Sequence, residues 1–290
     1  MKLSINVTNY SWPGSPTQLA GRLAELARLA DAAGLDTVWV PDHLLQVDPN
    51  AGIDEPMLEA YATLGYLASA TTGVSLGTMV TSVAMRPPAL IVKAVTTIDV
   101  LSGGRAWLGV GTGYNAEEAS RCALPFPSTP ERYDRLEELL QLADHLWNGT
   151  NDPFEGSFHS IDAPLASPMP VKRPRVLIGG MGERRTLPLV ARYADACNLF
   201  DIPDGGRTLR HKLNVVAAAC ERIGRDPAEI EVTLSSRVGE GETADELTER
   251  CAGLRALGID HLVLVSGHPW QPGPELDTVL EAADAVRRLA

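Results

Sequence analysis

The residues best suited to chemistry follow short apolar runs. Asp42 and His43 stand directly after the run 37–40. A histidine can take or give a proton near neutral pH, and a nearby carboxylate can hold its tautomer. By itself this dipeptide is more typical of a surface turn. Its position at the carboxyl end of an expected barrel strand gives a catalytic interpretation equal weight.

Two glycine-rich segments could approach a phosphorylated ligand. Residues 109–115 read GVGTGYN, which does not match the G-x-G-x-x-G dinucleotide pattern. These glycines permit close backbone approach, as in a methyltransferase-type nucleotide loop, but a tight turn explains them equally well. Residues 178–187 read IGGMGERRTL and run from a strand pattern into a helical one. The helix start there could bind a phosphate, and an ordinary strand-to-helix turn is the alternative.

These residues must be positioned by the elements around them, and the sequence alternates β-branched runs with longer amphipathic patterns. The expected strands are 2–7, 37–40, 74–80, 106–111, 175–180, 196–200, 229–236 and 261–266. The expected helices are 17–34, 55–71, 87–102, 131–147, 183–194, 206–224, 243–258 and 274–290. Gly34 and Gly258 are expected to stop their helices in the left-handed conformation.

Strands separated by helices imply parallel, right-handed crossovers, and eight such units favour a closed barrel over an open sheet. The interval 152–170 has turn residues and alternating apolar positions but no helical period. We therefore predict an α/β fold, a (β/α)8 TIM barrel with a hairpin-bearing insertion after the fourth βα unit. We expect one domain over residues 1–290, with the insertion acting as a partial lid at the carboxyl ends of the strands.

Composition excludes several function classes. The chain has 290 residues and a net charge of −12 without a Lys/Arg run, which argues against binding to nucleic acid or to anionic lipid. No apolar stretch has membrane-spanning length, and the start does not resemble a signal peptide. The cysteines lie far apart in sequence, so no metal site is expected, and reduced thiols suit a cytoplasmic protein. They are Cys122, Cys197, Cys220 and Cys251.

Taken together, several segments resemble the luciferase-like monooxygenase superfamily, and the resemblance spans essentially the whole chain. They are WVPDHL (39–44), LGTMVTSVAMRPPALIVKAVTTIDVLSGGRAWLGVGTGYNAEE (76–118), FEGSFHSID (154–162) and VLIGGMGERRTLPLVARYADACNL (176–199). The Asp-His pair resembles the branch that uses the deazaflavin F420 rather than flavin mononucleotide (FMN).

The resemblance implies roles for individual residues. His43 matches the active-site histidine, and Asp42 matches a neighbouring cofactor contact. Met79 and Val80 match a non-proline cis peptide that supports the back of the deazaflavin ring. The implied ring, ribityl or phosphate contacts are Ser82, Thr112, Gly113 and Asn115, and the implied phosphate cradle is Gly180, Met181 and Gly182. Cations that could meet the anionic glutamate tail of F420 are Lys172, Arg173, Arg175, Arg184 and Arg185.

We therefore expect an enzyme, an F420-dependent oxidoreductase that moves a hydride between the deazaflavin and a small organic substrate. An FMN-dependent monooxygenase and a non-catalytic F420-binding protein are the alternatives. Tyr114 stands where sugar-phosphate dehydrogenases of the family carry a catalytic glutamate, which argues against a sugar phosphate. Family members commonly form homodimers. Five side chains could line an aromatic pocket or simply pack: Tyr10, Trp12, Tyr114, His268 and Trp270.

Overall fold

The computed structural model describes residues 1–14 and 16–289, and in this part of the chain eight parallel strands close into a barrel. The sheet closes because β3 pairs with β5 as well as with β2. The barrel strands are β1 (Lys2–Asn6), β2 (Thr37–Val40), β3 (Ser75–Thr78), β5 (Ala106–Gly111), β8 (Arg175–Gly179), β9 (Ala196–Phe200), β10 (Glu231–Arg237) and β11 (His261–Val265). The predicted TIM-barrel fold is confirmed.

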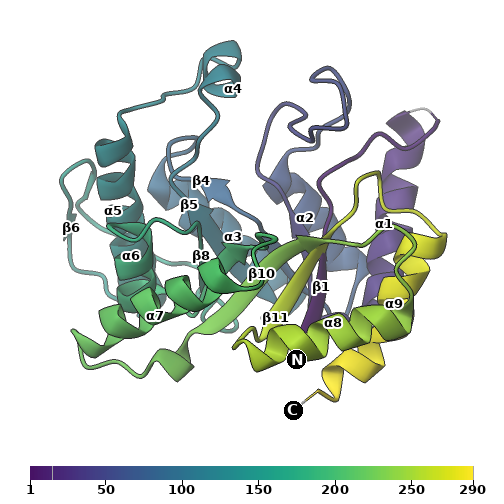
Figure 1. Cartoon of the computed structure of the whole chain (residues 1–290). Coiled ribbons are helices and arrows are strands. Elements are labelled where there is room, and N and C mark those ends of the chain that lie inside the picture. Colours follow the sequence, from purple (N-terminus) through teal and green to yellow (C-terminus); the bar gives the residue numbers. More distant parts are fainter. Residues whose placement is uncertain (15, 290) are drawn as a thin grey trace.

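Helices surround the barrel (Figure 1). They are α1 (Pro16–Ala33), α2 (Ala60–Ala70), α3 (Pro88–Ser102), α4 (Ala116–Arg121), α5 (Thr129–Trp147), α6 (Thr186–Tyr193), α7 (Arg207–Glu221), α8 (Ala244–Ala256) and α9 (Pro274–Arg287), with a 3-10 turn at Pro227–Glu229. Gly34 and Gly258 have φ values of +71° and +93°, as expected for left-handed helix stops. Among the helices of residues 1–14 and 16–289, none is both long and apolar enough to span a bilayer.

The structure differs from the expected elements around the loops above the barrel. Helix α2 begins at Ala60 rather than at residue 55, because the Glu59 side chain accepts from the main-chain N–H of Ala62 and caps the helix there. The residues before it form a long loop after β2. The short helix α4 and the two-residue strand β4 (Thr81–Ser82), which pairs with β5, were not predicted.

The predicted hairpin is present, but the prediction that it forms a lid is wrong. Strands β6 (Phe154–Glu155) and β7 (Ser160–Ile161) pair antiparallel beside α5. The Nδ1 atom of His159 lies 2.6 Å from Oε1 of Glu138 on that helix. Figure 1 shows β6 next to α5 and far from α4 at the top of the view. The reason is geometric: α5 returns the chain to the amino-terminal side of the barrel before the insertion begins.

The barrel interior is filled in layers, because every second residue of a strand points inward. The indoles of Trp39 and Trp107 meet with ring centroids 5.4 Å apart. Gly77 leaves the room that they occupy, since a Cβ there would lie 2.6 Å from the Trp39 ring. Leu177, Ala196 and Val263 belong to the same buried apolar cluster.

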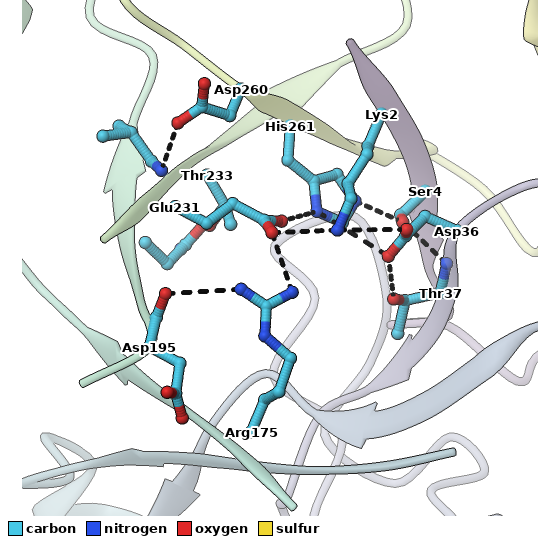
Figure 2. Close-up of polar contacts among 12 residues, drawn as sticks. Lys2, Ser4, Asp36, Thr37, Arg175, Asp195, Glu231, Thr233, Asp260 and His261 are labelled. Atoms are coloured by element: carbon cyan, nitrogen blue, oxygen red, sulfur yellow. Dashed lines mark hydrogen bonds and ion pairs between the residues drawn. The ribbon is translucent and has the colours of Figure 1, made fainter. Parts of the chain in front are cut away.

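Below the tryptophans, the amino-terminal end of the barrel holds an ion-pair network centred on Glu231 (Figure 2). Its carboxylate contacts Lys2 at 2.9 Å, Arg175 at 2.8 Å and Nδ1 of His261 at 2.8 Å. His261 is fully buried, and its Nε2 lies 2.5 Å from the Ser4 hydroxyl. Burial alone would raise the pKa of Glu231, but the hydrogen bond and charge of His261 and the charge of Lys2 hold that pKa well below its usual range.

Candidate active site

A cavity of about 880 Å³ opens at the carboxyl ends of the barrel strands. This is the end at which TIM-barrel enzymes place their chemistry. All the predicted site residues except Met181 and Gly182 line this cavity. The predicted residues that line it are Asp42, His43, Met79, Val80, Ser82, Thr112, Gly113, Asn115 and Gly180.

His43 is held in the cavity wall by a carboxylate that the sequence analysis missed. Its Nδ1 lies 2.7 Å from Oε2 of Glu118, which is almost completely buried. The other oxygen of Glu118 accepts from the main-chain N–H groups of Leu44, at 2.6 Å, and Leu45, at 3.1 Å. Asn115 positions this residue, because its side chain accepts from the Glu118 N–H and caps α4.

The charge of Glu118 sets the tautomer of His43. Burial alone would raise the pKa of Glu118, but His43 and the two backbone N–H groups outweigh it and lower that pKa. An ionised carboxylate can only accept, so His43 donates from Nδ1. Its Nε2, which has no partner among the described residues, is left for a ligand. The rings of Tyr114 and His43 make a T-shaped contact, with centroids 5.8 Å apart.

Asp42 does not orient His43, which corrects one of its two predicted roles. Its Oδ2 lies 2.5 Å from Nη1 of Arg86, and Arg86 also binds Glu59 at 2.6 Å. The Oδ1 atom of Asp42 is buried and has no partner within the described residues. Because the residue lines the cavity, this orphan acceptor is available to a ligand N–H or O–H.

The Met79–Val80 peptide bond is cis, as the resemblance implied. The glycines around it make room for protein rather than only for ligand. A Cβ at Gly111 would lie 2.9 Å from a methyl carbon of Val80, and one at Gly179 would lie 3.1 Å from the other methyl carbon. A Cβ at Gly113 would collide with Ser82. The glycine-rich segment therefore lets Val80 and its neighbours form the cavity wall.

The loop before α6 presents free backbone donors. Within the described residues, no acceptor meets the main-chain N–H groups of Met181, Gly182 and Glu183. No side chain caps α6 at Arg185. A Cβ at Gly182 would lie 2.8 Å from Oγ1 of Thr186 and fill the turn. Such a loop at a helix start suits an anionic group.

The predicted tail-binding cations do not all lie at this end. Arg175 belongs to the Glu231 network, and Arg173 pairs with Asp195 at 3.0 Å. The main-chain N–H of Lys172 donates to Asp99. These three residues precede or begin a strand, so they sit on the amino-terminal side. Arg184 and Arg185 are beside the loop at the carboxyl-terminal side.

The cavity lining combines apolar and polar side chains. Its apolar members include Leu124, Pro125, Phe126, Phe200, Pro203 and Val238. Asn6, Asn198 and Ser235 lie at the strand ends below, and the buried Oδ1 of Asn6 has no partner among the described residues.

Among the predicted aromatic residues, only Tyr114 lines this cavity. Tyr10, Trp12 and Trp270 are buried in the core, where Trp12 Nε1 donates to the Trp270 carbonyl. His268 is exposed and does not line the cavity.

Comparisons with known proteins bear on the family and the fold of the chain. The luciferase-like monooxygenase family matches residues 1–283. An F420-dependent glucose-6-phosphate dehydrogenase of Kineococcus radiotolerans is 31% identical over 239 residues, which are 79% of this chain and 67% of that protein. An F420-dependent hydroxymycolic acid dehydrogenase of Mycobacterium tuberculosis is 30% identical over 77% of this chain and 61% of its own length. The solved structure of an F420-dependent secondary alcohol dehydrogenase with an F420-acetone adduct is 20% identical and has a TM-score of 0.82, covering 99% of both chains.

Proposed function

Because this chain belongs to the luciferase-like monooxygenase family, we propose that it is an F420-dependent oxidoreductase that moves a hydride between the deazaflavin and a small organic substrate. The observation that carries the proposal is His43, held by the buried Glu118 in the wall of a cavity of about 880 Å³. A homodimer and a cytoplasmic location stay expectations that accompany it.

The residues present fit the cofactor. The free N–H groups of Met181 and Gly182 suit its phosphate, with Gly180 leaving backbone space at a φ of +114°. Met79 and Val80 give a wall against which a flat ring can lie. The remaining predicted contacts, Ser82, Thr112, Gly113 and Asn115, line the same cavity. When bound, the deazaflavin supplies the hydride chemistry, and the protein supplies position and exclusion of water.

His43 is the proposed catalytic residue. With Nδ1 hydrogen-bonded to Glu118, its Nε2 can take a proton from a substrate hydroxyl or return one to a carbonyl. The same atom, once protonated, can stabilise negative charge on a reduced ring. Glu118 is a positioning residue, because it acts through His43 and does so while ionised.

The proposed substrate is a small molecule with an apolar body and a hydroxyl or carbonyl end. The apolar lining residues, together with the amide and hydroxyl groups at the strand ends, support this class. A sugar phosphate suits the cavity poorly, because Arg237 is the one Lys or Arg side chain among the described residues that line it.

Titration of the purified protein with F420 and, separately, with FMN tests the cofactor. Ring fluorescence should change with F420 at micromolar or lower concentration and should respond only weakly to FMN. Tight binding of FMN without binding of F420 would overturn the proposal and favour the monooxygenase. Turnover on a panel of alcohols and ketones then separates an enzyme from a protein that only binds the cofactor.

A further inference from the structure

One arginine of the large cavity carries a charge that the protein does not use. Arg237 is the last residue of β10, and it is exposed where it lines the cavity. Its backbone is held in place, because it pairs in register with Val265 of β11 and its carbonyl accepts from Arg250. The part of the chain that the structure describes offers its guanidinium no hydrogen-bond or ion-pair partner. The barrel therefore places a free cation at the cavity.

The carboxylates that line the same cavity do not neutralise this cation. Each of them already accepts from another group of the protein. Among the described residues, none of them forms an ion pair with Arg237, although the protein as a whole has a net charge of −12. These carboxylates are those of Asp42, Asp48, Glu118 and Asp201.

A second hydrogen-bond donor faces the same space as Arg237. A Cβ at Gly267, in the loop after β11, would lie 3.6 Å from Nη1 of Arg237 and 3.8 Å from Nδ2 of Asn50. The Asn50 amide donates one of its two hydrogens to the Gly267 carbonyl at 3.2 Å. Because Gly267 has no side chain, a ligand group can enter this space between a guanidinium and an amide N–H. Two such donors suit the two oxygens of a carboxylate.

Arg237 and His43 line the cavity from separate parts of the barrel rim. His43 follows β2, and the strand order β2-β1-β11-β10 puts two strands between β2 and β10. Three strand spacings of about 4.8 Å make about 14 Å along the rim. Val265, opposite Arg237, and Val238, next to it, also line the cavity. A ligand that reaches both His43 and Arg237 therefore needs an apolar spacer of several bonds.

We propose that Arg237, assisted by Asn50, binds a carboxylate of the substrate while its alcohol or ketone group reacts at His43. The substrate is thus a hydroxy acid or a keto acid with an apolar spacer. The inference rests on the proposed function and deepens it by naming the substrate class. A single guanidinium matches the single charge of a carboxylate, and its planar fork can bind both oxygens.

The test uses unbranched methyl-ketone acids with three, five or seven methylenes between the carbonyl and the carboxylate. Each acid is compared with its primary amide and with a trimethylammonium ketone of the same length. Calorimetric titrations of the F420-loaded protein at low ionic strength give the affinities, and turnover gives KM and kcat. The variants are Arg237→Gln and Arg237→Lys. Arg222→Gln is the matched control, because Arg222 is an exposed arginine after α7 that does not line the cavity.

The wild type should bind the best-fitting acid about fivefold more tightly than its amide, as an exposed ion pair allows. This preference should fall as salt is added, and it should appear in KM rather than in kcat, since the carboxylate is remote from the reacting carbon. Arg237→Gln should bring the preference close to one. Arg237→Lys should keep about twofold, because an ammonium keeps the charge without the planar fork, and Arg222→Gln should keep all of it.

Three results would overturn the carboxylate site while F420 binding leaves the proposed function standing. The first is equal binding of acid and amide at every length, or binding of no acid at all. The second is a preference for the acid that Arg237→Gln does not reduce. The third is tightest binding of the trimethylammonium ketone, which would show that the cavity carboxylates decide the charge of the substrate. Failure of the protein to bind F420 would overturn the proposed function together with the inference.

Discussion

Replacing Glu118 with glutamine separates the charge of this residue from its shape. One amide oxygen can still accept from the N–H groups of Leu44 and Leu45, but the amide nitrogen then faces Nδ1 of His43. Two donors cannot bond, so His43 must turn its lone pair to the amide and carry its proton on Nε2. The ring keeps its place while its cavity-facing atom changes from acceptor to donor.

The expected effect follows from that change of tautomer. Positioned proton transfer typically contributes about 10²–10⁴-fold, so turnover in Glu118→Gln should fall by about this factor. Affinity for F420 should stay within about tenfold, because the phosphate loop is elsewhere. The lost charge-assisted hydrogen bonds should lower the free energy of unfolding by about 1.5–3 kcal/mol.

The assay has two readouts. Two-bond ¹H–¹⁵N NMR spectra report the tautomer of His43, which is assigned by its loss in His43→Gln. Loss of the oxidised deazaflavin absorbance measures turnover. Glu117→Gln is the control, since Glu117 neighbours Glu118 on α4 but is exposed and pairs with Arg121. An unchanged Nδ1–H tautomer with normal turnover in Glu118→Gln would refute the reasoning.

Three further predictions concern the cofactor, the catalyst and the barrel base. His43→Ala should cut turnover by about 10²–10⁴-fold with F420 affinity within about tenfold, and activity retained in His43→Gln would assign charge stabilisation rather than proton transfer. Gly180→Val and Gly182→Val should each weaken F420 binding strongly in fluorescence titrations. The φ of Gly180 is +114°, which strains a valine, and a Cβ at Gly182 meets Thr186. Met181→Ala should change F420 affinity little. A larger loss of affinity in Met181→Ala than in the two glycine variants would contradict binding by the backbone of this loop. Glu231→Gln should lower the free energy of unfolding by about 3 kcal/mol, measured by urea denaturation at pH 7. Because the folded-state pKa of Glu231 is depressed, that stabilisation is present above about pH 4.3 and is lost as pH falls toward the folded value. The free energies of unfolding of the wild type and of Glu231→Gln should therefore converge in acid. A difference between them that does not depend on pH would count against a stabilising role of ionised Glu231.

Much of the fold could be predicted because each strand-helix unit shows the spacing of apolar residues that is typical of its strand or its helix. Apolar alternation and helical spacing located the barrel strands, and Gly34 and Gly258 marked helix ends correctly. The helix expected from residue 55 failed for a local reason: apolar spacing continues upstream, whereas the Glu59 cap decides the true start. The interpretation of the whole chain as one domain stays a prediction.

The site was predictable where it depends on strand ends and not where it depends on long-range contacts. His43 and Gly180 follow strands, so the barrel rule alone places them at the cavity. The spacing from Asn115 to Glu118 was a readable helix-start signal, but nothing local says that this carboxylate reaches back to His43. The predictions of a lid and of a cofactor-binding role for the basic residues near 172 were wrong because α5 returns the chain to the opposite end of the barrel before these segments.

The pairing of β1 with β11 has a consequence for how the chain reaches its native state. Lys2 lies opposite His261 and Asn6 opposite Val265, so the pairing of the first barrel strand with the last joins residues some 259 positions apart. Contacts of such large sequence separation slow folding, since a long loop must be ordered before they form. Until β11 has been synthesised, β1 and β10 each present an unpaired edge, which is the surface from which misassembly with another chain starts. Of the barrel strands, β11 is synthesised last, and its pairing with both edges ends the period in which they are exposed.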